Sequence, residues 1–440
     1  MKKFRIITLG CKVNQAESEA IASRLAGPDW QPADSPEEAD LCLINTCTVT
    51  RKAALQSRQA VRQAIHASPQ ACIAVTGCYA ETDPQALLNI KGLDCIVNQA
   101  GKPSLPEIIR ASGIVKSDRP TLLGSPGEAS RPPDVLPSGT PAGRTRPFLK
   151  IQDGCDAFCT YCIVPYARGR SRSTPLPAVL AGMEHLAAQG FHEVVLTGIH
   201  IGIYGRDLDP PSSLLELLQR IAALKAPVRV RLSSIEPLEL THEIVALLAA
   251  SDRFCRHFHI PLQSGDRNIL KRMGRPYSPE VFSALVRKIR RLLPDAAIGV
   301  DVLAGFPGET EAAFENTFQL IQALPVSYLH VFPFSARPGT AAQAFPDHVP
   351  LEEIKQRCTR LRQLGSRKRL AFHHSFLSQH VQVLTESRRD PKTGLLKGVS
   401  SNYLPVLVEG GDELRNRLVS VRILQADASR LLGTLAEALM

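Results

Sequence analysis

Three cysteines stand close together in one predicted loop. Cys155, Cys159 and Cys162 have the spacing Cys-x3-Cys-x2-Cys and follow a predicted strand, Phe148–Ile151. Three thiolates this close can bind one metal centre, and an odd count of eleven cysteines without an expected export signal disfavours a disulfide framework. A structural zinc site needs a fourth ligand, and no Cys or His follows closely. A four-iron cluster suits three cysteines better, because one iron then stays open for a substrate.

Three further cysteines each follow a predicted strand in the first eighty residues. The strands are predicted at Phe4–Leu9, Asp40–Ile44 and Ala71–Thr76, and the cysteines after them are Cys11, Cys47 and Cys78. Parallel strands end along one edge of a sheet, so these thiols are expected to converge there and to suit a second cluster with an open iron. The alternative is that they are small buried apolar residues. That alternative is kept for the other five cysteines, Cys42, Cys72, Cys95, Cys255 and Cys358.

The segments around these cysteines predict an α/β fold with several units. Residues 1–115 alternate strand-like and helix-like segments, which predicts a parallel sheet with helices on its faces. Residues 116–146 are rich in proline and glycine and predict a linker. Residues 147–372 contain six strand–helix repeats, typical of a partial or full barrel of parallel strands. Residues 373–440 predict a small β-barrel of short strands with glycine-rich turns.

Together the motifs resemble the methylthiotransferase family of radical S-adenosylmethionine enzymes over essentially the whole chain. The segments that carry the resemblance are TLGCKVN (8–14), NTCTVT (45–50), TGC (76–78) and the cluster loop with its continuation IVPYARGRSRS (163–173). The resemblance implies an α/β chain that ends in a β-barrel of the TRAM type. It also implies an enzyme that inserts sulfur and then a methyl group at an unreactive C–H bond.

The resemblance assigns a role to each set of cysteines. Cys155, Cys159 and Cys162 are expected to hold a radical-generating 4Fe–4S cluster that binds S-adenosylmethionine. Cys11, Cys47 and Cys78 are expected to hold an auxiliary 4Fe–4S cluster whose open iron carries the sulfur to be transferred. No catalytic residue beyond these ligands is predicted.

Other motifs resemble contacts to S-adenosylmethionine in this family. The residues expected to make them are Tyr161, Thr197, Gly198, Ser234, Glu236 and Gln263. Tyr161 is expected beside adenine, backbone near Gly198 at the methionine amine, and Glu236 at the ribose hydroxyls. For each residue the alternative is a structural role, as a turn glycine, a cap or a satisfied polar group in the core.

The substrate is predicted from a short discriminator and from charge. Branches of the family act on threonylcarbamoyladenosine in tRNA, on isopentenyladenosine in tRNA, or on an aspartate of a ribosomal protein. The triplet Lys12-Val13-Asn14 resembles the threonylcarbamoyladenosine branch, whereas the other branches tend to carry Gln-Met-Asn or Pro-Lys-Asn there. A formal net charge of +10 also favours a polyanionic partner such as tRNA.

Two further hypotheses remain open from the sequence. One keeps the chemistry but takes a ribosomal protein side chain or isopentenyladenosine as substrate, and the other is a non-catalytic iron–sulfur regulator that binds RNA. A methylthiotransferase also implies two partners that the motifs do not identify, an electron donor and a sulfur source. Apolar runs are strand-sized, so no membrane span is expected and the predicted location is cytoplasmic.

Overall fold

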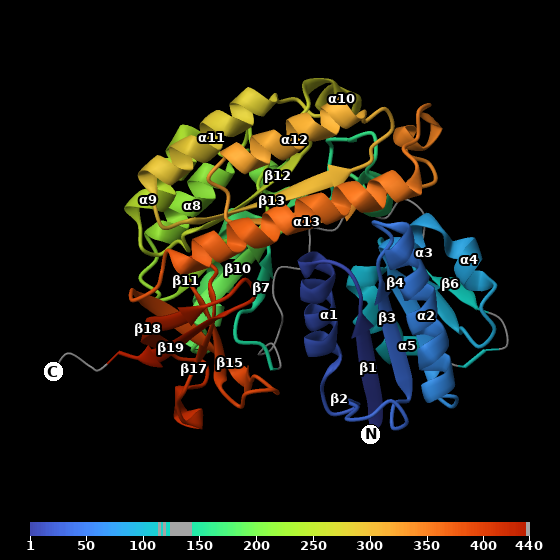
Figure 1. Cartoon of the computed structure of the whole chain (residues 1–440). Coiled ribbons are helices and arrows are strands. Elements are labelled where there is room, and N and C mark those ends of the chain that lie inside the picture. Colours follow the sequence, from blue (N-terminus) through green and yellow to red (C-terminus); the bar gives the residue numbers. More distant parts are fainter. Residues whose placement is uncertain (113–115, 118–119, 124–142, 437–440) are drawn as a thin grey trace.

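The N-terminal unit is a six-stranded parallel sheet in the order β2-β1-β3-β4-β5-β6 (Figure 1). The structure is a computed structural model that describes residues 1–112, 116–117, 120–123 and 143–436. The strands are β1 (Lys2–Thr8), β2 (Trp30–Pro32), β3 (Leu41–Thr46), β4 (Cys72–Gly77), β5 (Cys95–Val97) and β6 (Thr121–Leu123). Helices α1 (Lys12–Leu25) and α5 (Leu105–Ser112) cover one face, and α2 (Arg51–Ala67), α3 (Cys78–Thr82) and α4 (Pro84–Leu88) cover the other.

The sheet extends into the range that the sequence predicts as a linker. β6 lies at Thr121–Leu123 and pairs with β5 in parallel. Three residues are too few to show the alternation of apolar and polar residues that identifies a strand, and the surrounding prolines and glycines favour a loop instead. Residues 124–142 of the predicted linker lie outside the described residues.

The central unit is a partial barrel of six parallel strands. The strands are β7 (Phe148–Lys150), β10 (Glu193–Thr197), β11 (Arg229–Leu232), β12 (His257–Gln263), β13 (Ala297–Ala304) and β14 (Tyr328–Pro333), which form two three-stranded sheets, β7-β10-β11 and β12-β13-β14. Backbone bonds near Val230 and Cys255 join β11 to the segment before β12, so the strands follow one another in chain order. Six predicted strands are thereby confirmed, and the barrel is partial.

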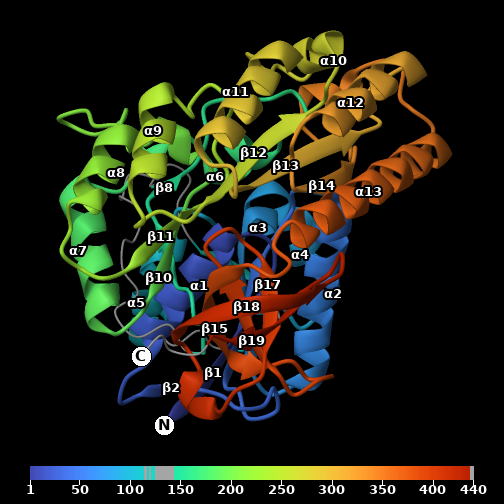
Figure 2. The ribbon, with the colours of Figure 1, turned by 60° about the vertical axis from the view of Figure 1, so that its left-hand side comes forward.

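Helices cover the outer face of this partial barrel (Figure 2). They are α7 (Leu176–Ala188), α8 (Leu214–Ala222), α9 (His242–Ala250), α10 (Arg267–Arg272), α11 (Pro279–Leu292), α12 (Glu311–Ala323) and α13 (Leu351–His374). Side chains alternate along each strand. The outward set, including Leu149, Val194 and Val300, packs on the helices in one large core. The inward set is polar and includes Lys150 and Asp301, so the inner face of the partial barrel can bind polar groups.

The C-terminal unit is a closed five-stranded barrel in the order β15-β16-β17-β19-β18. Its strands are β15 (His380–Arg389), β16 (Leu396–Ser400), β17 (Pro405–Val408), β18 (Leu418–Ala426) and β19 (Leu431–Leu435). Buried Arg231 of β11 attaches the barrel to the central unit, because its guanidinium donates to the carbonyl of Ser400 at 2.9 Å. Tyr403 stacks on His257 of β12, with ring centroids 4.4 Å apart. The Tyr403 ring therefore packs between the two units.

Candidate functional site

The loop with Cys155, Cys159 and Cys162 lies between two short elements, β8 (Gln152–Asp153) and α6 (Val164–Arg168). Gly154 turns the chain into this loop with φ +74°. A Cβ atom there would lie 1.9 Å from the Arg170 carbonyl oxygen, so the turn requires glycine. The three thiols are all partly exposed on the same short loop.

Two cationic side chains approach the sulfurs of this loop. The Arg275 guanidinium donates to Cys159 Sγ at 3.2 Å, and His200 Nδ1 lies 3.4 Å from Cys155 Sγ. Burial lowers the pKa of His200, but its contacts with Cys155 and Glu239 outweigh burial and raise the pKa to about 9. Burial also raises the pKa of Cys162 to about 12. A metal centre bound at this loop would hold that thiol in its ionised form.

The second set of cysteines lies where three adjacent strands end. Strand register aligns these ends, because Thr8 pairs with Asn45 and Asn45 pairs with Thr76. Cys11 precedes α1, Cys47 directly follows β3 and Cys78 begins α3. Cys47 and Cys78 are buried and Cys11 is exposed, so the set is open on one side. Burial raises the pKa of Cys47 to about 11 and also raises that of Cys78.

Both sets fit a polynuclear cluster better than a single ion. One zinc ion with Zn–S bonds of about 2.3 Å would hold its sulfur ligands about 3.8 Å apart. Among the described residues, neither set of cysteines brings three sulfur atoms within 4.8 Å of one another. Three cysteine ligands would hold three irons of a four-iron cluster and leave the fourth iron free.

A buried ionic network joins the two cysteine sites. Arg168, six residues after Cys162, donates to Glu17 of α1 at 2.8 Å and to Asp153 at 2.8 Å. It also donates to Asn14, which in turn donates to the carbonyl of Thr46 at 2.9 Å, next to Cys47. The two thiol sets are thereby positioned relative to each other by a single fully buried arginine.

The residues predicted to contact S-adenosylmethionine lie at the rim of the partial barrel that carries the cluster loop. Thr197 and Gln263 end β10 and β12, and Gln263 has φ +63° at a break in the strand register. Ser234 Oγ lies 2.8 Å from His259 Nδ1, and the Glu236 carboxylate accepts from Arg275. Tyr161 packs edge-on against Phe306 in the turn after β13.

The backbone amides after Gly198 are already hydrogen-bonded to Gln152, a residue that the sequence analysis did not identify. The amides of Ile199 and His200 both donate to Gln152 Oε1, at 3.0 and 2.8 Å. A Cβ atom on Gly198 would lie 2.9 Å from the Gln152 carbonyl oxygen, which explains the glycine. Gln152 looks in sequence like an ordinary residue after a strand, so no local signal identifies it.

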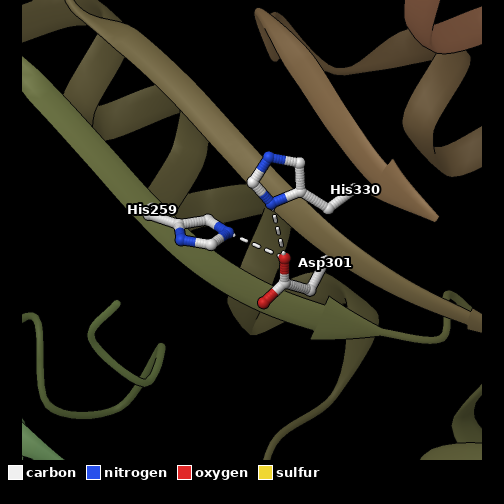
Figure 3. A group of neighbouring side chains, drawn as sticks. All are labelled: His259, Asp301 and His330. Atoms are coloured by element: carbon white, nitrogen blue, oxygen red, sulfur yellow. Dashed lines mark hydrogen bonds and ion pairs between the residues drawn. The ribbon is translucent and has the colours of Figure 1, made fainter. Parts of the chain in front are cut away.

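A polar trio on the inner face was also missed. Asp301 of β13 accepts from His259 at 2.7 Å and lies 3.2 Å from His330 of β14 (Figure 3). Burial raises the pKa of Asp301, but the contacts with the two histidines outweigh burial and lower the pKa to about 2. The strand alternation, which points these three side chains inward, is the signal that identifies them.

A cavity of about 440 Å³ opens where the three units meet. It is lined by cationic side chains from each unit, including Lys12, Arg146, Arg231 and Lys397, and by Tyr403. A second cavity of about 320 Å³ shares Arg146 and Tyr403 and reaches His330. These cavities can hold an anionic ligand beside the inner face of the partial barrel. None of the described helices is long and apolar enough to span a bilayer.

Comparisons with known proteins support one family across the chain. Residues 3–98 match the model described as Uncharacterized protein family UPF0004, and residues 149–321 match the Radical SAM superfamily. Threonylcarbamoyladenosine tRNA methylthiotransferase MtaB of Bacillus subtilis is 37% identical over 425 residues, 95% of this chain and 93% of that protein. The tRNA-2-methylthio-N(6)-dimethylallyladenosine synthase of Pelotomaculum thermopropionicum is 33% identical over 99% of this chain and 98% of that protein.

The fold is also shared with a solved structure. The radical S-adenosylmethionine methyltransferase TsrM of Kitasatospora setae has a TM-score of 0.56 and 18% identity, covering 78% of this chain and 75% of that chain. The curated relatives align with nearly the whole chain rather than with one unit. The chain therefore belongs to the methylthiotransferase family of radical S-adenosylmethionine enzymes, which use S-adenosylmethionine and 4Fe–4S clusters to transfer sulfur-containing groups.

Proposed function

We propose that this protein converts threonylcarbamoyladenosine next to the anticodon of tRNA to its 2-methylthio derivative. The observation that carries the proposal is the pair of cysteine sites, joined by Arg168 and set beside a cationic cavity. One set of ligands is needed to produce a radical and another to supply sulfur. The bound clusters and S-adenosylmethionine supply the radical, the sulfur and the methyl group.

The cysteines divide this work between two units. Cys155, Cys159 and Cys162 hold the radical-generating cluster, and Cys11, Cys47 and Cys78 hold the auxiliary cluster. Tyr161, Thr197, Gly198, Ser234, Glu236 and Gln263 bind S-adenosylmethionine at the barrel rim. Arg275 orients Glu236 while it contacts Cys159, so the cofactor site and the first cluster share one positioning residue.

Two observations favour threonylcarbamoyladenosine over isopentenyladenosine. Curated relatives named for threonylcarbamoyladenosine include those of Bacillus subtilis and Aquifex aeolicus, at 37% and 34% identity. A relative named for dimethylallyladenosine is 33% identical to this chain, so sequence identity alone distinguishes the two substrate branches only weakly. The cationic cavity is the stronger argument, because a threonyl group carries a carboxylate and an isopentenyl group does not. The enzyme acts on tRNA in the cytoplasm, with an electron donor and a sulfur source as further partners.

Two triple variants test the division of work. Replacing Cys11, Cys47 and Cys78 with Ala is expected to leave about four irons per chain, to preserve cleavage of S-adenosylmethionine and to abolish methylthiolation. Replacing Cys155, Cys159 and Cys162 is expected to abolish cleavage as well. Iron analysis and chromatography of 5′-deoxyadenosine measure both outcomes.

The matched control is Cys358→Ala, a buried cysteine on α13. This variant is expected to retain both clusters and full activity. Methylthiolation that survives loss of Cys11, Cys47 and Cys78 would refute the assignment of the auxiliary cluster.

A further inference from the structure

Lys12 stands apart from the other cations that line the central cavity. It follows Cys11 at the start of α1, and its half-buried side chain lines the cavity with Arg146, Arg231 and Tyr403. Within the part of the chain that the structure describes, its ammonium group makes no hydrogen bond or ion pair. A partly desolvated ammonium without a counter-ion is unfavourable unless an anion binds beside it.

Arg146 and Arg231, which line the cavity with Lys12, already have partners. Arg146 pairs with Glu386 at 3.0 Å. Arg231 pairs with Glu193 at 2.7 Å and donates to the Ser400 carbonyl at 2.9 Å. These arginines make the cavity positive, and each also makes a contact that holds the C-terminal barrel in place. Among the described residues, Arg388 also lines the cavity without a hydrogen bond or ion pair, but it is exposed to solvent. Lys12 is the partly buried cation of the lining that can turn to a ligand without breaking a contact.

We propose that Lys12 determines substrate specificity by binding the carboxylate of the threonyl group on the target adenosine. This inference rests on the proposed function. The carboxylate is the anionic group that distinguishes this nucleoside from unmodified adenosine and from isopentenyladenosine. A charge-assisted hydrogen bond from an ammonium group is the interaction that recognises it most strongly.

The position of Lys12 in the chain suits this role. Lys12 directly follows Cys11, a proposed ligand of the auxiliary cluster, so the residue that would bind the substrate and a ligand of the sulfur source are neighbours in the chain. Asn14, two residues further on, is buried and anchors this end of α1 to the Leu9 and Thr46 carbonyls. The backbone from which the Lys12 side chain extends is therefore fixed. Binding and sulfur delivery are thereby coupled through one short segment.

An oxyanion in this cavity has a second possible source, because RNA phosphates are anions too. The two sources predict different dependence on the base modification. A carboxylate contact affects only RNA that carries the free threonyl acid. A phosphate contact affects every RNA of the same sequence and adds to the salt dependence of binding, so its loss reduces that dependence.

The test compares Lys12→Met with the wild type on three anticodon stem-loops. They carry threonylcarbamoyladenosine, its methyl ester, or unmodified adenosine at the target position. Lys12→Met is expected to reduce kcat/KM and affinity for the free acid by about 10- to 100-fold, the loss typical of a hydrogen bond to a charged group. Replacing the free acid with the methyl ester is expected to reduce kcat/KM of the wild type by a similar factor. With the ester, the wild type and Lys12→Met are expected to have equal kcat/KM values. Lys12→Arg is expected to recover most of the loss.

Controls separate this inference from folding and from the proposed function. Lys91→Met changes an exposed lysine before β5, at the sheet edge opposite the cysteines, and is expected to behave as the wild type. Iron content must stay unchanged in every variant. Equal losses on all three stem-loops would assign Lys12 to phosphate, and no loss on any would leave it without a role, so either result overturns the inference. A wild type that fails to methylthiolate the free acid would instead refute the proposed function.

Discussion

At the scale of single residues, Arg275 links the first cysteine site to the predicted cofactor contacts. Its guanidinium donates to Cys159 Sγ at 3.2 Å and to the carboxylate of Glu236. Reduction adds negative charge to a cluster, and a nearby cation with a hydrogen bond to a ligand sulfur stabilises the reduced state. Arg275 is therefore expected to raise the reduction potential of the radical-generating cluster.

Arg275→Met is expected to lower that potential, on the order of 60 mV, the shift that corresponds to a tenfold change in a one-electron equilibrium. Redox titration of the reconstituted protein, followed by electron paramagnetic resonance, measures it. Arg267→Met is the matched control, because Arg267 is exposed and pairs only with Glu280 among the described residues. An unchanged or higher potential in Arg275→Met would contradict this role.

The sequence identifies the cysteines but not the residues that contact them. The cysteines are recognisable because their type and spacing are unusual within one short loop. Arg275 contacts Cys159 across 116 positions, and Gln152 contacts His200 across 48. Common residue types that meet only after folding carry no local signal, so Arg275 and Gln152 could not be predicted.

At the scale of elements, parallel strands account for the second cysteine site. The prediction that β1, β3 and β4 end at one edge follows from alternation alone, and the structure adds that these three strands are adjacent. The short strands β2, β5 and β6 have three residues each, and the sequence prediction did not include them. β2 and β5 pair with the longer strands β1 and β4, and β6 pairs with β5.

Gly77, the last residue of β4, sets the position of Cys78 in the second cysteine site. It has φ +100°, and a Cβ atom there would lie 2.4 Å from the Thr46 carbonyl oxygen. Gly77→Ala is expected to displace Cys78, to destabilise the fold by about 1–3 kcal/mol and to reduce iron by about four per chain. Thermal unfolding and iron analysis measure both effects.

Gly27→Ala provides the control for this substitution. No atom lies within 4 Å of a Cβ built on Gly27, so this change is expected to leave iron content and stability unaffected. Full iron content in Gly77→Ala would show that the position of Cys78 does not depend on this glycine.

At the scale of the whole molecule, buried charges join the units. Glu17 of α1 accepts from Lys102 at 2.7 Å, from Lys150 at 3.1 Å and from Arg168 at 2.8 Å. Burial raises the pKa of Glu17, but these three cations outweigh burial and hold the pKa well below its usual range. In sequence Glu17 looks like a solvated helix residue. The ion pairs through which it joins the N-terminal and central units could therefore not be predicted, although the fold class was.

The cationic cavity lies between all three units. The α/β sheet, the partial barrel and the small β-barrel are each recognisable from strand patterns. Their arrangement is not, because it depends on contacts such as those of Glu17 and Arg231 that join distant segments. The cationic cavity is thus a property of the assembled molecule.

Mass spectrometry of tRNA nucleosides from cells with and without this gene tests the central claim most directly. Without the gene, 2-methylthio-threonylcarbamoyladenosine is expected to disappear and threonylcarbamoyladenosine to accumulate, and the wild-type gene is expected to restore the product. Loss of the methylthio group from isopentenyladenosine instead would contradict the substrate assignment. An unchanged set of tRNA nucleosides would contradict a role in tRNA methylthiolation altogether.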